Sequence, residues 1–274
     1  MTNSRHMLSL KLLEIDTAKT AEKISSFIRQ QVEISGLNGA VVSVSGGLDS
    51  SVVLALTARA LGSSRVRALT MPERDITPES DITDVTRLAE ALNVTCDTVE
   101  ITPVLRVMYG AIPLYDPSDR VSAGNLTART RIVVVYYYAN ALRSMVMGCG
   151  NKTEWLTGYF TKYGDGAADI MPIADLYKNQ VRQLARHLEI PEDIIGKTPT
   201  AGLWPGQSDE EELGVKYDVL DLILLGRERG MSEDEVADDL NIDTGLVRRM
   251  YRRVATNEHK RRPPLILRLS TAKG

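Results

Sequence analysis

The stretch VVSVSGGLDSSVV, residues 41–53, places two glycines between two apolar segments. The first segment, which starts at residue 39, is short and rich in β-branched residues, as is typical of a strand covered on both faces. The second, residues 49–62, is long enough for a helix and ends at Gly62. A strand, a glycine turn and a helix follow one another, which predicts one unit of a parallel α/β sheet.

This glycine turn has the chemistry of an anion site. Gly46 and Gly47 let backbone N–H groups approach phosphate oxygens, and the following helix adds the positive end of its dipole. The hydroxyl donors of the turn are Ser43, Ser45, Ser50 and Ser51. The same residue types are also common in an ordinary strand–helix turn, so the turn alone leaves both interpretations open.

Asp49 is the residue of the turn that would repel a phosphate. Its carboxylate fits a phosphate site if Mg²⁺ lies between them, because Mg²⁺ is commonly held by one or two carboxylates together with phosphate oxygens. Residues 43–51 contain no lysine, so the G-x-x-x-x-G-K-[ST] loop is absent, and G-x-G-x-x-G is absent too. We therefore expect a magnesium-dependent phosphate site of another kind.

Strand and helix patterns alternate along the chain. Further strands are predicted at 65–72, 94–101 and 144–151, and helices at 16–35, 78–93, 118–143 and 177–190. Residues 153–172 are predicted to be irregular and 198–214 to be a long loop, with C-terminal helices at 209–226, 232–240 and 243–260. The pattern predicts an α/β fold with a Rossmann-like parallel sheet, helices on both faces and right-handed crossovers.

Composition narrows the class of protein. The 274 residues, 43% of them apolar, can bury a substantial core as a single domain over 1–274. The formal charge of −3 favours neither a nucleic acid nor a membrane as a general partner. No apolar run approaches the roughly 20 residues that cross a bilayer, and there is no signal peptide, so we expect a cytoplasmic protein. The opening residues MTNSRHM look partly like a cloning remnant, and we expect 1–10 to be disordered or partly foreign.

The sequence SGGLDS, residues 45–50, resembles the SGGxDS loop of the N-type ATP pyrophosphatases. These enzymes cut ATP between its α- and β-phosphates and transfer AMP to a carboxylate or carbonyl oxygen. Four further stretches resemble ammonia-dependent NAD synthetase, in the same order and spacing. They are GNLTARTR (124–131), GYFTKYGDGAADIMPIADLYK (158–178), TPTAGLWPGQSDEEELG (198–214) and NEHKRRPP (257–264).

This resemblance covers residues from about 40 to 264 and implies a fold of the adenine nucleotide alpha hydrolase type. The implied activity is the amidation of deamido-NAD to NAD with ATP and ammonia, through an acyl-adenylate. Glutamine-dependent relatives carry an extra amidase domain, for which this chain has no room, so the nitrogen source is expected to be free ammonia or a separate amidotransferase subunit. A homodimer is also implied, with RIVVVYYYANAL (131–142) at its interface; the alternative for that segment is an ordinary core helix.

The resemblance also implies the site residues. ATP would be bound by Ser43, Ser45, Gly46, Gly47, Asp49, Ser50, Cys149, Lys178 and Thr200. Deamido-NAD would be bound by Arg129, Lys162, Asp169, His259 and Lys260. Asp49 and Glu154 would hold Mg²⁺, since both are expected at the carboxyl ends of parallel strands, where such sheets bind ligands. Asp165 is the candidate to bind ammonium and take its proton, because ammonia attacks only as the neutral base.

Cys149 departs from the family pattern, which usually has a threonine that touches ATP at this position. A thiol is a weaker hydrogen-bond partner than a hydroxyl, so the role of its side chain is open. No neighbouring base is visible in the sequence, which argues against a catalytic thiol.

Two other functions remain to be weighed. The first is another ATP pyrophosphatase, of the tRNA thiolase or GMP synthetase type, although thiolases commonly need cysteine pairs or an added RNA-binding domain. The second is a DNA-binding regulator, because residues 232–262 resemble a helix-turn-helix with seven lysines and arginines between 248 and 262. The segment EHKRRPP matches the synthetase and favours a basic helix that closes over a dinucleotide.

Overall fold

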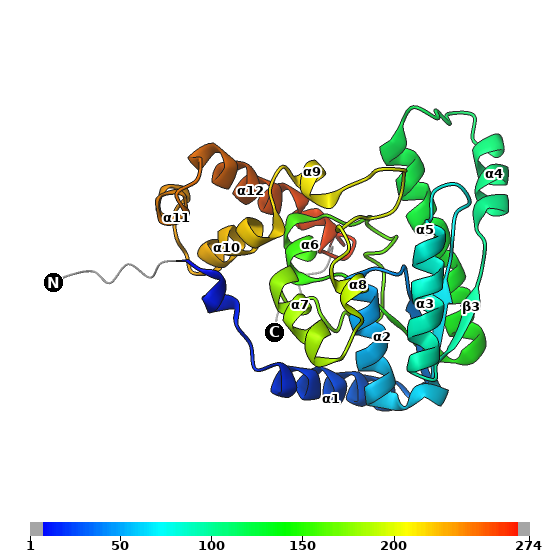
Figure 1. The fold of residues 1–274 in the computed structure, drawn as a ribbon. Helices are drawn as coiled ribbons and strands as arrows, with labels where there is room; N and C mark the ends of the chain where they lie inside the picture. Colours follow the sequence, from blue (N-terminus) through cyan, green and yellow to red (C-terminus); the bar gives the residue numbers. More distant parts are fainter. Residues whose placement is uncertain (1–7, 268–274) are drawn as a thin grey trace.

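The computed structural model describes residues 8–267 (Figure 1). Within this part of the chain, four parallel strands form one sheet in the order β3-β2-β1-β4. The strands are β1 (Gly39–Ser43), β2 (Val66–Thr70), β3 (Thr95–Thr98) and β4 (Ser144–Met147). The chain runs outward from β1 to β3 and then crosses back to place β4 on the other side of β1. This reversal of direction between β1 and β4 is where open α/β sheets bind ligands.

Helices cover both faces of the sheet, which confirms the predicted α/β class (Figure 1). One face carries α2 (Leu48–Leu61), α3 (Glu79–Ala91) and α7 (Lys178–His187), with α1 (Thr17–Ser35) packed outside α2. The other face carries α4 (Thr102–Ala111) and α5 (Arg120–Leu142). No helix of residues 8–267 has both the length and the apolar character that a bilayer span requires.

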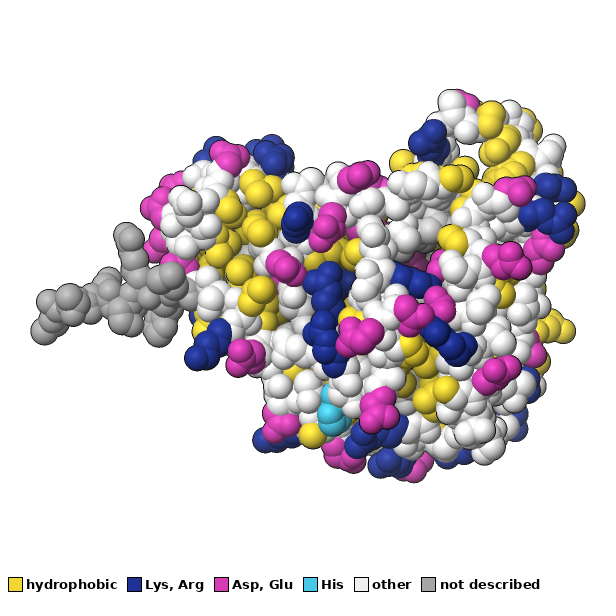
Figure 2. Space-filling model, viewed as in Figure 1, with side chains coloured by type: hydrophobic (Ala, Val, Ile, Leu, Met, Phe, Trp, Pro, Cys, Tyr) yellow, Lys and Arg dark blue, Asp and Glu magenta, His cyan; other side chains and the backbone are white. Residues whose placement is uncertain are grey.

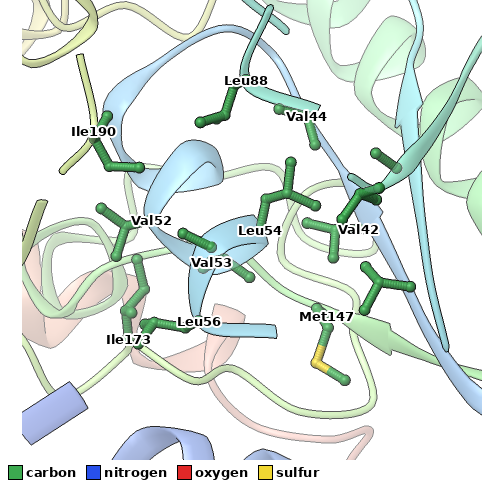
Figure 3. Packing of buried hydrophobic residues seen from close by; sticks show 14 of the residues in the cluster. Val42, Val44, Val52, Val53, Leu54, Leu56, Leu88, Met147, Ile173 and Ile190 are labelled. Atoms are coloured by element: carbon green, nitrogen blue, oxygen red, sulfur yellow. The ribbon is translucent and has the colours of Figure 1, made fainter. Parts of the chain in front are cut away.

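Alternation along β1 explains the two-sided core. Val42 packs with α2 on one face, where Figure 3 shows it near Leu54 and Met147. Val41, the preceding residue, belongs to the cluster on the other face with Val135 of α5. Successive side chains of a strand point to opposite faces, so a nearly continuous apolar run is what a doubly covered strand needs.

The C-terminal helices form a third cluster beside this sheet (Figure 1). They are α10 (Tyr217–Glu228), α11 (Glu233–Leu240) and α12 (Thr244–Thr256), followed by a short 3-10 helix, Asn257–Lys260. Ser232 and Glu235 form a capping box at the start of α11, and the Asp243 side chain caps α12. Because α10 packs against α6 (Lys152–Thr157) and α7, this cluster borders the carboxyl edge of the sheet.

Several predicted boundaries were wrong. The helix expected at 209–226 is interrupted at Gly214, whose φ of 69° ends α9 (Asp209–Leu213) before α10 begins. The helix expected at 243–260 ends at Thr256. Three short or unexpected helices, α4, α6 and α8 (Glu192–Ile195), lie where the sequence analysis assigned no helix. The N-x-x-E pattern that begins at Asn151 is the capping box of α6 and was the signal for it.

The N-terminal expectation is partly outside the described residues, which begin at residue 8. Leu8 is buried, and a 3-10 helix follows at Leu10–Leu13. Leu8 and Leu13 pack into the cluster of α10–α12, and the Leu8 N–H donates to Asp239. The predicted disorder was therefore wrong for residues 8–10, because the segment buries leucines against helices that are distant in sequence.

Candidate active site

The SGGLDS loop connects β1 to α2 at the switch point of the sheet. Gly46 has a φ of 84°, and a Cβ there would lie 2.8 Å from the Asp81 carbonyl oxygen, so both conformation and space require glycine. Gly47 is the N-cap of α2, and its carbonyl accepts hydrogen bonds from the hydroxyls of Ser50 (3.1 Å) and Ser51 (2.8 Å). The loop thus holds backbone N–H groups and serine hydroxyls at a helix N-terminus, as an anion site requires.

Lys197 holds this loop from outside, and the sequence analysis did not single it out. Its Nζ donates to the Gly46 carbonyl at 2.9 Å and pairs with Asp81 and Asp84 of α3 at 2.6 Å each. The lysine joins the loop to α3 and to the segment after α8. No local pattern marked this role, because its partners lie more than 110 residues away in sequence.

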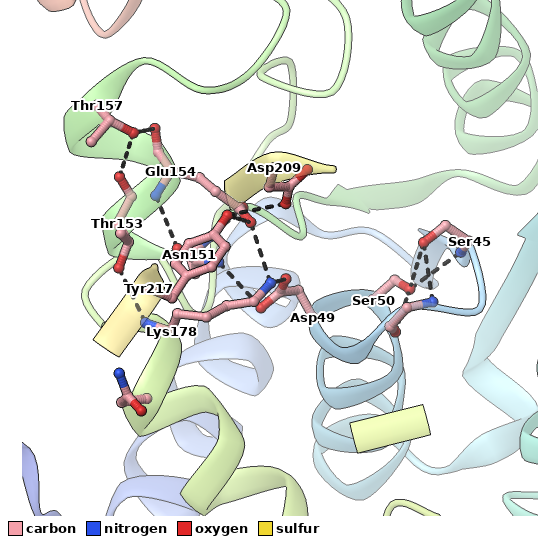
Figure 4. A network of polar contacts seen from close by, with 12 residues as sticks. Ser45, Asp49, Ser50, Asn151, Thr153, Glu154, Thr157, Lys178, Asp209 and Tyr217 are labelled. Atoms are coloured by element: carbon pink, nitrogen blue, oxygen red, sulfur yellow. Dashed lines mark hydrogen bonds and ion pairs between the residues drawn. The ribbon is translucent and has the colours of Figure 1, made fainter. Parts of the chain in front are cut away.

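A buried charge cluster lies beside the loop (Figure 4). Lys178 Nζ is 2.5 Å from Asp49 Oδ2 and 3.5 Å from Glu154 Oε1, so the ammonium bridges the two predicted magnesium ligands. The Lys178 side chain is 5% exposed and each carboxylate 16%. Asn151, which caps α6, also donates from Nδ2 to Asp49 Oδ1 at 3.3 Å. The N-termini of α2, α6 and α7 therefore bring these residues to one point.

Burial and the mutual charges of the cluster shift the pKa values of Glu154 and Lys178. Burial and the nearby charge of Asp49 raise the pKa of Glu154 to about 8, although Lys178 opposes the shift. Burial alone would lower the pKa of Lys178, but Asp49 and Glu154 outweigh it, and the pKa lies above its ordinary value. The lysine therefore stays charged, while the pKa of Glu154 is raised into the range around neutral pH.

Tyr217 and Asp209 complete the cluster, and the sequence analysis missed both. The Tyr217 hydroxyl donates to Asp209 Oδ2 (3.1 Å) and lies 3.5 Å from Glu154 Oε1. Lys178 Nζ lies 5.1 Å from the centre of the Tyr217 ring. Asp209 is buried, and its Oδ1 has no hydrogen-bond partner among the described residues. The acidic start of α9, within the TPTAGLWPGQSDEEELG stretch, was the available signal for Asp209.

Asp49 and Glu154 could hold Mg²⁺ only together with oxygen ligands from a bound substrate. Among residues 8–267, no three His, Cys, Asp or Glu side chains are grouped so that they could hold a metal ion by themselves. Asp49 and Glu154 offer two hard oxygen ligands next to the anion-binding loop, and Mg²⁺ usually completes its shell with phosphate oxygens and water.

The other residues that were predicted to bind ATP lie outside the charge cluster around Lys178. Cys149 is partly buried, its Sγ donates to the Ser43 carbonyl at 3.5 Å, and burial raises the pKa of its thiol above the ordinary value. Ser43 itself ends β1 and Ser45 is exposed. Thr200 is exposed in the 198–214 segment, where its Oγ1 accepts a hydrogen bond from the Gly202 N–H. Thr200 is thus not joined to the cluster around Asp49.

Three of the five predicted deamido-NAD residues are linked through main-chain carbonyls, and a fourth, Lys260, directly follows one of them. Arg129 Nη2 donates to the Lys162 carbonyl (3.2 Å), and Lys162 Nζ donates to the His259 carbonyl (2.6 Å). Lys260 Nζ donates to the carbonyls of Gly158 (2.7 Å) and Phe160 (2.8 Å). Arg129 and His259 are exposed, so this side of the site is more open than the cluster around Lys178.

Asp169 and Asp165 have other partners. Asp169 Oδ2 accepts a hydrogen bond from the Val146 N–H of β4 (2.8 Å), and its Oδ1 accepts one from the Tyr136 hydroxyl (3.2 Å). Asp165 Oδ1 accepts one from the Thr161 N–H (2.8 Å). Asp165 is exposed. Desolvation raises the pKa of its carboxyl, whereas hydrogen bonds from backbone N–H groups, and after them the charges of Lys260 and Arg131, oppose the shift.

The parallel sheet, the glycine–serine loop at its switch point and the carboxylates beside it define an α/β protein that binds a nucleoside triphosphate, of the ATP pyrophosphatase class. The NAD synthase family model matches residues 20–264, and the chain belongs to this family. It is 44% identical to the NH(3)-dependent NAD(+) synthetase of Methanosarcina acetivorans over 250 residues. These 250 residues are 91% of this chain and 98% of that protein. It is 45% identical to the Hyperthermus butylicus protein of the same name, over 93% of this chain and 92% of the relative.

Two solved structures of synthetases share the fold of this chain. The NMN synthetase from Francisella tularensis matches with a TM-score of 0.82 and 31% identity, over 93% of this chain and 99% of that one. The NH3-dependent NAD synthetase from Campylobacter jejuni, solved with a nitrate ion, matches with a TM-score of 0.78 and 32% identity, over 93% and 100% of the two chains.

Proposed function

We propose that this protein converts deamido-NAD to NAD with ATP and ammonia. The observation that carries the proposal is the SGGLDS loop beside the buried cluster of Asp49, Glu154 and Lys178. It is supported by family membership and by relatives named NH(3)-dependent NAD(+) synthetase, which match this chain over nearly their whole length. The enzyme is thus a ligase that forms a C–N bond.

The reaction first activates a carboxylate, which is a poor electrophile at neutral pH. The nicotinate carboxylate of deamido-NAD attacks the α-phosphorus of ATP, the bond to the β-phosphate oxygen breaks, and pyrophosphate leaves into the SGGLDS loop. Ammonia then attacks the acyl carbon of the adenylate, AMP leaves, and the amide remains. Backbone N–H groups of the loop and Lys178 stabilise the charge on the phosphates as the bond breaks. Mg²⁺ held by Asp49 and Glu154 would offset the charge of ATP.

Asp165 is our candidate for the ammonia site. A carboxylate that is open to solvent can bind ammonium and accept its proton. The Asp165→Asn variant should lose amidation at sub-saturating ammonium while AMP formation persists. Wild-type amidation combined with weaker binding of deamido-NAD would assign Asp165 to that substrate instead.

The homodimer is supported by exposed apolar side chains of α4, of α5 and of the segment that joins them. They are Val104, Val107, Ile112, Leu114, Val121, Val133 and Tyr137, and Figure 2 shows hydrophobic atoms gathered at the corresponding end of the molecule. Large exposed apolar patches on soluble proteins mark interaction sites. Val133→Glu should yield a monomer in sedimentation, whereas Ile34→Glu, equally exposed on α1, should not. A dimer that survives Val133→Glu would exclude this face.

The helix-turn-helix alternative is less well supported. Helices α11 and α12 do form such a unit, but Arg253, Lys260 and Arg261 donate to main-chain carbonyls of residues 154–160, and Arg248 pairs with Glu233. Acidic and basic side chains are mixed across the face drawn in Figure 2. A salt-dependent shift of duplex DNA at micromolar protein would favour the regulator.

One incubation tests the main proposal. Purified protein with ATP, Mg²⁺, ammonium and deamido-NAD should form NAD, AMP and pyrophosphate in equal amounts, and no NAD and no AMP would overturn the proposal. Glutamine in place of ammonium tests the nitrogen source. The likeness to the Francisella tularensis NMN synthetase gives a second acceptor, nicotinic acid mononucleotide, and the ratio of the two kcat/KM values decides between them.

A further inference from the structure

Asp221 is a fully buried carboxylate that the proposed chemistry does not use. It lies on α10, one helical turn after Tyr217, so both side chains share the face of α10 that packs on α6 and α7. Its exposure to solvent is 0%, and a buried carboxylate is costly unless its oxygens are hydrogen-bonded. The partners of Asp221 therefore indicate what it is for.

All these partners lie at the first turns of the two helices that carry Glu154 and Lys178. The Thr153 hydroxyl donates to Asp221 Oδ1 at 2.5 Å. The Asn179 backbone N–H and Nδ2 donate to Asp221 Oδ2 at 2.9 and 2.8 Å. Thr153 precedes Glu154, and Asn179 follows Lys178. One carboxylate thus ties the start of α6 to the start of α7.

A further hydrogen bond closes the network. Thr153 Oγ1 accepts the Lys178 backbone N–H at 3.1 Å, and this group has no partner within its own helix because it lies in the first turn of α7. The chain Asp221–Thr153–Lys178 therefore runs from α10 to the residue that bridges Asp49 and Glu154. Burial raises the pKa of Asp221, and the donors from Thr153 and Asn179 oppose this.

We propose that Asp221, acting through Thr153 and Asn179, is a positioning residue that sets Glu154 and Lys178 relative to Asp49 for binding of a magnesium–nucleotide. This inference rests on the proposed function of the site. It predicts that the network affects affinity for ATP and Mg²⁺ beyond its effect on stability, because a small shift of either helix start moves a charged group that touches the phosphates.

The sharpest test is a pair of substitutions at Thr153. Thr153→Val keeps the volume and removes the hydroxyl, whereas Thr153→Ser keeps it. Thr153→Val should raise the ATP KM and the Mg²⁺ concentration for half-maximal activity by roughly 10- to 100-fold, as substitutions behind metal ligands commonly do. It should also shrink the rise in Tm that ATP with Mg²⁺ produces. Thr153→Ser should stay within about threefold of the wild type in each measurement.

Asp221→Asn should resemble Thr153→Val, and the double variant should be no worse than the more severe single one, because both changes break one chain of hydrogen bonds. Two controls separate positioning from stability. Asp218→Asn breaks an exposed ion pair with Arg182 between the same two helices, α10 and α7. Ile28→Val loosens the distant core at α1. Both should keep the wild-type KM for ATP and the wild-type Tm rise with ligand.

If Thr153→Val lowers Tm as Ile28→Val does but leaves the KM and the ligand-induced Tm rise unchanged, the network is only structural and the inference is overturned. If Asp221→Asn does not fold, the Thr153 pair still decides. Failure of the proposed function looks different: the wild type itself would show no Tm rise with ATP and Mg²⁺ and would form no AMP, and this inference would fall with it.

Discussion

The two sides of the site differ in how their charged groups are satisfied. On the ATP side, Lys178 is paired with two carboxylates, all three are largely buried, and helix starts hold them in place. On the acceptor side, Arg129, Lys162 and Lys260 donate to main-chain carbonyls. The charges of Lys178, Asp49 and Glu154 on the first side are paired with one another, whereas we propose that the second side exchanges its main-chain partners for substrate atoms.

This difference separates two ways to make a binding site. A buried ion cluster is expensive to assemble, so its geometry is fixed during folding by the caps and packing around it. Hydrogen bonds to carbonyls are weaker and can be replaced one at a time by a phosphate or a carboxylate. We therefore expect substitutions on the ATP side to act on catalysis and on the binding of ATP with Mg²⁺, and those on the acceptor side to act on the binding of deamido-NAD alone.

Removal of the Lys178 charge should have the largest effect. In Lys178→Met, the two carboxylates lose their shared cation, and the phosphates lose a charge placed for the transition state. We expect kcat for AMP formation to fall by at least about 100-fold, as when a preorganised donor is removed from an active site. AMP and NAD formation are measured with saturating ATP and deamido-NAD.

Lys152→Met is the matched control for this lysine. Lys152 also pairs with two acids, but these are Asp175 and Glu228, which belong neither to the loop nor to the cluster around Lys178. Its loss should leave kcat within about threefold of the wild type, as for groups that make no contact in the transition state. Equal losses in the two variants would show that ion pairing matters only for stability, and the contrast between the two sides would fail.

Lys260→Met should have the next largest effect and should act on one substrate. In the proposed reaction the Lys260 ammonium exchanges the carbonyls of Gly158 and Phe160 for deamido-NAD, so its loss should raise the KM for deamido-NAD about tenfold, which corresponds to roughly 1.4 kcal/mol. The KM for ATP should not change. Steady-state kinetics with each substrate varied in turn measures both.

Arg261 gives the comparison for Lys260. Its guanidinium donates to the carbonyls of Trp155, Leu156 and Val254 and is not among the predicted substrate contacts. Arg261→Met should lower Tm and leave both KM values unchanged. If Lys260→Met behaves in the same way, the basic tail only closes the end of α6, and the acceptor binds elsewhere.

Glu154 should make the ATP side sensitive to pH. Its folded pKa, about 8, lies above the ordinary value of 4.5, so its contribution to stability is fully present below pH 4.5 and is lost as pH rises through 8. Between pH 6 and pH 9 the ligand-free wild type should lose at least about 1 kcal/mol relative to Glu154→Gln, or roughly 2–4 °C in Tm. Calorimetry at the two pH values measures the difference.

A bound cation should remove this difference. ATP with Mg²⁺ favours the ionised carboxylate, so the wild type should no longer lose stability between pH 6 and pH 9 relative to Glu154→Gln. A pH dependence that is the same in both proteins without ligand would assign the effect to another group, and Glu154 would then be ionised throughout.

The parts of this molecule that sequence predicted are those with local signals. A nearly continuous apolar run and the glycine turn predicted β1 and α2, and the expected strand ends predicted that Asp49 and Glu154 lie close together, as they do around Lys178. Lys178 came only through resemblance, because its partner Asp49 lies 129 residues away. Gly214 broke a helix whose apolar pattern continued across it, since a left-handed residue can end a helix without changing the periodicity.

The positioning residues were not predicted because no local rule marks them. Lys197, Tyr217 and Asp221 contact groups that the fold brings from distant parts of the chain. An aspartate within an apolar helix was visible at 221, but without the tertiary structure it could not be told from one at the helix surface. The same holds for Lys260, whose present carbonyl partners no motif indicated.

Substitution of Cys149 should have the smallest effect on the ATP KM. It tests how much change the ATP side tolerates at a residue that makes only a weak hydrogen bond. The partly buried thiol is neutral, because its pKa lies above the ordinary value, and it donates to the Ser43 carbonyl at the end of β1. Cys149→Thr supplies a stronger donor in a similar volume. It should lower the ATP KM by no more than about threefold, since a neutral hydrogen bond contributes about 1 kcal/mol and one weak bond is already made. Cys149→Val, which removes the donor, should raise the KM by a similar factor.

A fall of tenfold or more in the ATP KM of Cys149→Thr would mean that the threonine hydroxyl contacts ATP directly. Cys149 would then be the one residue on the ATP side that withholds a contact to ATP.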